Sequence, residues 1–295
     1  MMSPGQKLRQ ILEQPGILVL PGVYDCIGAK IVEQIGFSAV FTSGFGISGS
    51  TLGRPDYGFL TATEMLYTVR GITESVNIPL VADIDTGYGN PLNVIRTVTD
   101  IVNMGVAGII LEDQEWPKKC GHFEGKRVIP MTEHVEKIKA AVHARGDSGL
   151  VIIARTDARA PLGLDEAIKR GRACAEAGAD VVFIEAPQSV EDLQAIATAF
   201  EDVYLFANMI EGGKTPVLSR DELAEIGFKI VVYPLSGLFS ATKAMINCYR
   251  QLFEHGTTTG LTDIVSFQDF EDIIEVPKYR ELEQKFSIRH LQNKK

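Results

Sequence analysis

Residues 116–122 contain the side-chain types of an acid–base site. A thiol, Cys120, and an imidazole, His122, stand two positions apart, and Lys118 and Lys119 come directly before them. Cations next to a cysteine stabilise its thiolate and lower its pKa. A thiol that exchanges a proton near neutral pH can act as an acid–base catalyst. The alternative is a structural cysteine in a lysine-rich surface loop, because lone cysteines are usually structural.

Asp83 and Asp85 form a second polar group, directly after the apolar run 80–82. The two aspartates alternate along an extended stretch, so both side chains point to one side. Carboxylates that converge at the end of a strand suit a hard divalent cation such as Mg²⁺, which prefers oxygen ligands and keeps several waters. The alternative is that the two residues cap a turn and the following helix.

The composition is that of a globular protein, with 45% hydrophobic and 23% charged residues among 295. The net charge is −9 and no basic stripe is present, which argues against a nucleic-acid partner. The four cysteines lack paired spacing, which predicts reduced thiols in the cytoplasm. We find no apolar segment of the kind that leads a secreted chain or spans a bilayer, and we expect no membrane partner.

Short apolar runs alternate with helical patterns along most of the chain. The runs predict strands at residues 17–20, 39–42, 80–82, 108–111, 151–154, 181–184, 204–207 and 230–233. The helical patterns fall at about residues 25–36, 62–76, 91–104, 132–145, 164–177, 189–200, 219–226 and 236–255. Eight strand–helix units predict the α/β class and one catalytic domain over residues 1–256, a (β/α)8 TIM-type barrel. The alternative is an open doubly wound sheet, but no glycine-rich fingerprint follows the first strand.

Almost every predicted strand is followed by a polar or charged residue. These residues are Asp25, Ser43, Asp83 with Asp85, Glu112 with Asp113, Arg155 with Asp157, Glu185, Asn208 and Ser236. Active sites of such barrels gather at the carboxyl ends of the strands. A structural protein has little reason to gather several carboxylates beside one arginine, so we predict an active site at this face.

Residues 257–295 have a different pattern. A turn at residues 257–260 is followed by a segment of phenylalanines and acids that has apolar positions but no strand pattern. We predict a C-terminal helical extension that packs on a neighbouring subunit. Packing on the chain's own barrel is the alternative.

Six short stretches together resemble the phosphoenolpyruvate mutase/isocitrate lyase superfamily over nearly the whole chain. They are residues 20–25, 42–44, 53–56, 83–89, 118–122 and 154–157. The stretch Lys118-Lys119-Cys120-Gly121-His122 is typical of the carbon–carbon lyases of this superfamily, whereas its mutases and phosphonate hydrolases usually lack the cysteine. Residues 208–216 are most similar to the 2,3-dimethylmalate lyase and oxaloacetate hydrolase branch, which includes the plant petal death protein.

The resemblance implies a Mg²⁺ site, with Mn²⁺ as a substitute cation. Asp83 would bind the cation directly. Asp85, Asp56 and Glu112 would hold the waters of the cation.

The resemblance also implies which residues act on a small dicarboxylate substrate. Cys120 would protonate the departing carbanion, in a catalytic group with Lys119, His122 and Arg155. Arg155 would bind the 2-oxo acid part, and a closing loop would grip the other carboxylate. The substrate-binding residues implied in this way are Ser43, Gly44, Phe45, Gly121, His122, Arg155, Glu185, Asn208 and Ile210.

Two positions depart from the methylisocitrate lyases, which the chain otherwise resembles. Phe239 stands where those enzymes carry an arginine, and Phe41 stands where they carry a tyrosine. Without these polar groups a third carboxylate lacks a partner. We therefore expect a smaller dicarboxylate, with or without alkyl substituents.

The resemblance implies a homotetrameric Mg²⁺-dependent lyase that cleaves a 2-hydroxy dicarboxylate of the 2-alkylmalate type between C2 and C3, or that hydrolyses oxaloacetate to oxalate and acetate. A 2-methylisocitrate lyase and a phosphonate-processing mutase or hydrolase are the enzymatic alternatives. A catalytically idle barrel that binds a carboxylate metabolite is the third alternative. It would be expected if one of the acids or the thiol were missing, and all are present.

Overall fold

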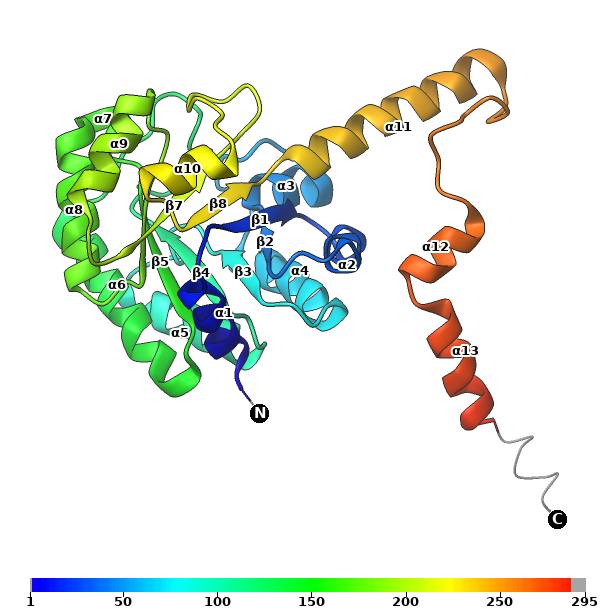
Figure 1. The fold of residues 1–295 in the computed structure, drawn as a ribbon, viewed down its shortest axis with the longest axis horizontal. Helices are drawn as coiled ribbons and strands as arrows, with labels where there is room; N and C mark the ends of the chain where they lie inside the picture. The colour runs from blue at the N-terminus through cyan, green and yellow to red at the C-terminus, as the bar shows by residue number, and fades with distance from the viewer. Residues whose placement is uncertain (1, 288–295) are drawn as a thin grey trace. The chain divides into compact units, whose positions relative to one another are not determined.

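Eight parallel strands form a closed barrel in the computed structural model, which describes residues 2–287. Each strand pairs with its neighbour in the chain, and β1 closes the barrel by pairing with β8, with Leu18 opposite Ile230. Figure 1 shows the helices around this barrel. The strands are β1 Leu18–Val23, β2 Val40–Thr42, β3 Leu80–Asp83, β4 Gly108–Glu112, β5 Val151–Thr156, β6 Val181–Ile184, β7 Tyr204–Asn208 and β8 Ile230–Tyr233.

The predicted (β/α)8 barrel is therefore confirmed, and each predicted strand and helix is found close to its expected place. The α-helices of the barrel are α1 Pro4–Glu13, α2 Cys26–Ile35, α3 Gly44–Ile47, α4 Ala62–Ser75, α5 Pro91–Asn103, α6 Met131–Arg145, α7 Arg159–Leu162, α8 Leu164–Glu176, α9 Val190–Ala199 and α10 Arg220–Ile226. A short π-helix, η1 Ser48–Leu52, and a 3-10 helix, η2 Gly146–Ser148, accompany them. Capping boxes begin two of these helices: Thr61 pairs with Glu64 at the start of α4, and Ser219 pairs with Glu222 at the start of α10.

The strand residues alternate between two apolar layers, which is why the strands read as continuous apolar runs. Residues such as Leu20, Val181 and Phe206 point into the barrel and pack on one another. Residues such as Ile109 and Val182 point outward and pack on the surrounding helices. The burial of both faces fixes the register of each strand and so fixes which residue ends at the rim.

Helix α1 was not among the predicted elements. Ser3 and Gln6 form a capping box at its start. Its buried residues Leu8 and Leu12 pack with the side chains inside the barrel, and Arg9 Nε donates to the carbonyl of Gly149 at 2.8 Å. The helix covers the amino-terminal ends of the strands, opposite the predicted active face.

The chain divides into two compact units, residues 1–239 and 240–295. The second unit holds most of α11 (Ser236–His255) and then α12 (Phe267–Ile273) and α13 (Val276–Lys285). The division precedes the predicted boundary at 256/257, because most of α11 belongs to the second unit. The helix buries no residue. Residues 288–295 of the predicted extension lie outside the described residues. Within residues 2–287, no helix combines the length and apolar character needed to cross a membrane.

Candidate active site

A cavity of about 50 Å³ opens at the carboxyl ends of the strands. Strands β2 to β8 each contribute at least one residue to its wall, as the barrel prediction requires. Polar groups and aromatic rings share the lining. The lining residues are Phe41, Ser43, Phe45, Asp56, Asp83, Ile110, Lys118, Cys120, Gly121, His122, Arg155, Phe183, Glu185, Phe206, Asn208, Ile210, Val232, Pro234 and Leu235.

Cys120 lies on a loop that covers this cavity, between the bridged residues Gln114 and Val128. We call residues 114–128 the covering loop. The side chain of Gln114 holds the loop by accepting from Lys119 N at 3.0 Å and donating to Lys119 O at 2.7 Å. The backbone N–H of Cys120 donates to Asp56 O at 3.0 Å. These contacts place the thiol at the wall of the cavity.

The pKa of the Cys120 thiol is raised, contrary to the expectation that neighbouring lysines lower it. Burial raises this pKa to about 11, and Asp56 and Glu185 add to the effect, while a hydrogen bond from the backbone of His122 and, after it, the charge of Lys118 oppose the shift. The thiol is thus protonated at neutral pH. A protonated thiol is ready to give a proton, which is the direction that a general acid needs.

The two lysines before Cys120 differ in position. Lys118 lines the cavity, and its Nζ lies 2.7 Å from both Asp56 Oδ1 and Asp85 Oδ1. Lys119 Nζ instead donates to the carbonyls of Glu124 and Gly125, at 3.4 and 3.2 Å. The structure therefore brings Lys118, and not the predicted Lys119, to the site. The sequence signal was the pair of lysines itself, which does not say which one turns inward.

Arg155 is surrounded by carboxylates at the end of β5. Its Nε lies 2.9 Å from Asp157 Oδ2 and 3.3 Å from Glu112 Oε2, and its Nη2 lies 3.3 Å from Glu185 Oε2. Burial disfavours the charged guanidinium, but these carboxylates raise the pKa of Arg155 above its ordinary value. Arg155 is thus a fixed cation in the cavity wall, suited to a planar carboxylate.

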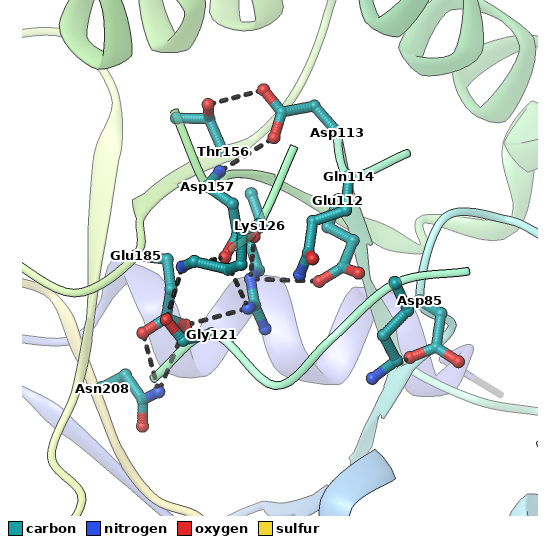
Figure 2. Close-up of polar contacts among 12 residues, drawn as sticks. Asp85, Glu112, Asp113, Gln114, Gly121, Lys126, Thr156, Asp157, Glu185 and Asn208 are labelled. Carbon is teal, nitrogen blue, oxygen red and sulfur yellow. Dashed lines mark hydrogen bonds and ion pairs between the residues drawn. The ribbon is translucent and has the colours of Figure 1, made fainter. Parts of the chain in front are cut away.

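Glu185 contacts three residues of the site, which are Asn208, His122 and Arg155. Figure 2 shows its contact with Asn208. Asn208 Nδ2 donates to its two oxygens at 3.4 and 3.3 Å, and His122 Nε2 lies 3.1 Å from Oε1. Burial would raise the pKa of Glu185, but Arg155 and His122 hold it well below its usual range. Glu185 therefore stays ionised and orients the residues that face the cavity.

The four predicted metal-site acids lie near one another but do not form one tight ligand set. Among the described residues, no three Asp, Glu, His or Cys side chains converge as direct metal ligands. Asp83 and Asp56 line the cavity. Asp85 and Glu112 are buried, and Asp85 Oδ2 and Glu112 Oε1 lack a hydrogen-bond partner.

This donor set fits a cation that has few direct protein ligands and keeps several of its waters. All the groups offer oxygen, which Mg²⁺ prefers, and unpartnered carboxylate oxygens can accept from its waters. Burial raises the pKa of Asp85 to about 7, even though Lys118 lowers it. A bound cation would stabilise the ionised form of this acid.

The predicted Ser43, Gly44 and Phe45 start α3 beside the cavity. Ser43 Oγ accepts from Gly46 N at 3.2 Å, and Ser43 and Phe45 line the wall. A Cβ at Gly44 would lie 2.9 Å from Asp83 Oδ2. A larger residue at position 44 would therefore require the Asp83 carboxylate to shift.

The two positions used to argue for a small substrate have different places. Phe41 lines the cavity, within the barrel. Phe239 is 41% exposed and is not part of the lining. Ile210 does line the cavity, as the resemblance implied. The argument about substrate size thus rests on Phe41 and the other apolar lining residues.

Some residues that hold the site were not predicted as part of it. Asp113 accepts from Thr156 Oγ1, Asp157 N and Arg170 Nη1 at 2.6, 2.8 and 2.9 Å, and Lys126 forms a buried ion pair with Asp157. Asp113 and Asp157 were visible as acids that follow strands. Their roles depend on contacts between distant segments, which the sequence does not show.

A barrel with a protonated thiol, a carboxylate-bound arginine and an acidic cluster at its rim defines a family of enzymes. The phosphoenolpyruvate phosphomutase family model matches residues 8–253, and the chain belongs to this family. The chain is 44% identical over 287 residues to 2,3-dimethylmalate lyase of Eubacterium barkeri, covering 97% of this chain and 99% of that one. It is 46% identical to a chloroplastic carboxyvinyl-carboxyphosphonate phosphorylmutase of Arabidopsis thaliana, covering 95% and 84%.

Solved structures agree with this placement. An oxaloacetate acetylhydrolase in complex with the inhibitor 3,3-difluorooxalacetate has a TM-score of 0.92 and 34% identity, covering 96% of this chain and 97% of that one. A phosphonopyruvate hydrolase in complex with oxalate and Mg²⁺ has a TM-score of 0.87 and 29% identity, covering 97% and 99%. The chain is an enzyme of the carbon–carbon lyase and hydrolase class of this superfamily.

Proposed function

We propose that this enzyme cleaves a 2-hydroxy dicarboxylate of the 2-alkylmalate type between C2 and C3, or hydrolyses oxaloacetate to oxalate and acetate, with Mg²⁺ as cofactor and Cys120 as general acid. The observation that carries the proposal is the protonated Cys120 thiol in the same small cavity as Arg155. A thiol acid is what the departing carbanion needs, and an arginine is what a carboxylate needs.

The substrate's two ends have separate partners in this proposal. Arg155, held by Glu185 and Asn208, binds the 2-oxo acid end. His122 and the backbone of Gly121 bind the other carboxylate from the covering loop, helped by the backbone at Ser43–Phe45. His122 lines the cavity, and its ring is held in place because Nδ1 accepts from Lys214 N at 2.8 Å and Nε2 lies 3.1 Å from Glu185 Oε1.

The cation would be held by Asp83, with Asp85, Asp56 and Glu112 around its waters. When bound, it supplies Lewis-acid polarisation of the substrate's C2 oxygen. The named acids keep that region negative and buried, and Lys118 offsets part of their charge. These four residues all offer carboxylate oxygens, which are the ligands that Mg²⁺ prefers.

The chemical step transfers one proton at Cys120. As the C2–C3 bond breaks, its electron pair goes to the leaving fragment as the enediolate of a carboxylic acid. The Cys120 thiol gives its proton to that carbon and becomes a thiolate. The hydroxyl at C2 gives its proton to a carboxylate of the cavity wall and becomes the 2-oxo group. Return of that proton to the Cys120 thiolate restores the site. With oxaloacetate, water first adds to the C2 keto group, and the same steps then release oxalate and acetate. The covering loop excludes water that would otherwise compete as the proton source.

The apolar part of the cavity supports a dicarboxylate over a tricarboxylate. Phe41, Ile210, Pro234 and Leu235 line it beside the polar groups. These side chains offer no charge to a third carboxylate but can contact alkyl substituents. The resemblance to a phosphorylmutase supports phosphonate chemistry as a second candidate. Cleavage of a P–C bond has no evident use for a thiol acid at the Cys120 position.

A substrate screen tests the proposal. Purified protein with Mg²⁺ is assayed against oxaloacetate, 2,3-dimethylmalate, 2-methylisocitrate and phosphonopyruvate. We expect the largest kcat/KM for oxaloacetate or an alkylmalate. A larger kcat/KM for 2-methylisocitrate would contradict the proposed substrate class. Turnover of phosphonopyruvate alone would contradict the proposed carbon–carbon cleavage.

We also propose a homotetramer in the cytoplasm. The extension from residue 240 buries no residue of α11, α12 or α13, and such apolar helices are stabilised when they pack on a partner. The four cysteines are all free thiols, which agrees with a reducing compartment.

A further inference from the structure

Lys126 belongs to the covering loop, and its positively charged ammonium lies in the protein interior. Its side chain is 1% exposed, and Nζ lies 2.7 Å from Oδ1 of Asp157, which is fully buried. The same Nζ donates to the carbonyl oxygen of Gly121 (Figure 2). Lysine is rarely buried this completely unless it is paired. Lys126 does not line the cavity, so the proposed chemistry does not account for it.

Asp157 connects Lys126 to the arginine of the site. Arg155 Nε donates to Asp157 Oδ2 at 2.9 Å, and Arg155 Nη2 donates to Asp157 Oδ1 at 3.1 Å. Asp157 Oδ1 therefore accepts from both the loop lysine and the site arginine. Burial opposes ionisation of Asp157, but Arg155 and Lys126 together keep its pKa below the ordinary value.

Gly121 makes a second link between the loop and Arg155. A Cβ at Gly121 would lie 2.6 Å from both Arg155 Nη2 and Glu185 Cδ, so the loop backbone rests directly on these two side chains. The Gly121 carbonyl is the group that Lys126 holds. One ammonium thus fixes the loop segment above Arg155 and the carboxylate beside it.

The charge balance explains why a cation is needed at this point. Arg155 lies within ion-pair distance of Glu112, Asp157 and Glu185. With Lys126 in place, Asp157 shares its charge between two cations. With Lys126 withdrawn, Asp157 would bind Arg155 alone and hold the guanidinium more tightly. A movement of the loop that withdrew Lys126 would therefore change how firmly Arg155 is held by the protein itself.

We propose that Lys126 is a positioning residue that couples closure of the covering loop to the orientation of Arg155. The proposal rests on the proposed function only where it assigns Arg155 to a substrate carboxylate. The coupling between loop and arginine stands on the contacts of Lys126, Asp157 and Gly121.

The test compares K126M with R127M by hydrogen exchange of the ligand-free protein. Arg127 is the next residue and a matched control, because its ion pair with Glu115 is exposed, at 76% and 42% for the two side chains. We expect the amides of residues 119–125 to exchange about 10- to 100-fold faster in K126M, the ratio expected for one lost charged hydrogen bond. R127M should exchange like the wild type. Equal exchange in the two variants would overturn the proposal.

A double-mutant cycle tests the named partner. D157N should also speed exchange of the loop, and the effects of K126M and D157N should be less than additive, because each variant removes the Lys126–Asp157 contact. Additive effects in the double variant would overturn the assignment to Asp157. Melting temperatures of all variants show whether the barrel itself has changed.

Kinetics connect the coupling to turnover. With oxaloacetate and Mg²⁺, K126M should lower kcat/KM about 10- to 100-fold while R127M leaves it unchanged. If the wild type turns over none of the screened acids, the proposed function fails while the exchange result still decides the coupling. If the wild type is active and K126M keeps full kcat/KM, the coupling has no role in catalysis and the proposal is overturned.

Discussion

At the scale of single residues, the most informative finding is that Cys120 is protonated although two lysines precede it. Lys118 is committed to Asp56 and Asp85, and Lys119 turns to loop carbonyls. Burial then dominates and raises the thiol pKa to about 11. The site thus holds a proton donor, and a nucleophilic thiolate would need a different environment.

The first prediction concerns this proton donor. Cys120→Ser should lower kcat by about 10²- to 10⁴-fold, because a serine hydroxyl is a far weaker acid and general acids typically contribute that much. Substrate binding and the melting temperature should change little. Steady-state kinetics and a thermal melt measure both quantities. A lower melting temperature with nearly unchanged kcat would identify Cys120 as a structural cysteine.

The second prediction concerns Asp83. Asp83→Asn keeps an oxygen that can accept from Asp85 N, which lies 3.1 Å from Asp83 Oδ1, but it removes the charge that a cation needs. We expect Mn²⁺ affinity, measured by calorimetry, to fall at least about tenfold, and turnover to be lost. The circular dichroism spectrum should match the wild type. Full activity of the wild-type enzyme in excess chelator would contradict the metal site.

At the scale of elements, the site depends on how β4 and β5 end. Asp113, after β4, accepts from Thr156 and from the backbone of Asp157, and Arg170 of α8 fixes Asp113 in turn. These bonds set the position of the end of β5, where Arg155 projects. A helix on the outside of the barrel thereby helps to orient a residue at its rim.

The third prediction concerns His134, which lies in α6 near this network. Burial lowers the His134 pKa from 6.5 to about 4; Asp113 and Asp157 oppose the shift, and Lys137 and Arg170 add to it. The unfolded chain therefore binds a proton between pH 6.5 and 4 while the folded protein does not, so stability falls as pH falls through this window. Between pH 7 and pH 5, His134 lowers the free energy of unfolding by about 2 kcal/mol.

His134→Leu should remove this pH-dependent contribution, because leucine does not titrate. The substitution breaks no hydrogen bond, since neither ring nitrogen of His134 has a hydrogen-bond partner. Denaturant unfolding of both proteins at pH 7 and pH 5 gives the difference. If the two proteins lose the same free energy of unfolding between these pH values, His134 is not the titrating group.

The elements were largely predictable from the sequence, and the contacts between them were not. Strands such as 181–184 and 230–233 read as apolar runs because both of their faces are buried. The carboxyl ends of parallel strands meet at one rim, so the places of Asp83, Arg155 and Glu185 followed from the fold. Loops have no such periodicity. The inward turn of Lys118 and the raised pKa of Cys120 depend on packing across segments far apart in the chain.

At the scale of the whole molecule, the barrel and the extension differ in how they are stabilised. The barrel has two apolar layers of its own. The extension has contacts between α12 and α13 but no buried residue in its helices. Every lining residue of the cavity lies at or before Leu235.

The fourth prediction is that this extension supports assembly. Light scattering should give the mass of a homotetramer at micromolar concentration. Phe253→Asp and Phe267→Asp should reduce the mass, since both rings are strongly exposed, at 92% and 83%, and would be covered by a partner. Tyr67→Asp on α4 is the control, with an exposed ring at 82% in the barrel. A monomeric wild type would reject the assembly.

The pairing of β1 with β8 also has a consequence for the nascent chain during synthesis. Strand β1 (Leu18–Val23) pairs with β8 (Ile230–Tyr233), which is synthesised last of the eight strands. More than two hundred residues are therefore translated before β1 can form this pairing. At about 5–20 residues per second, that wait lasts roughly 10–40 s. During this time an apolar strand has an open edge that other chains can join. Production of this enzyme in cells is therefore expected to depend on chaperones and on the rate of synthesis.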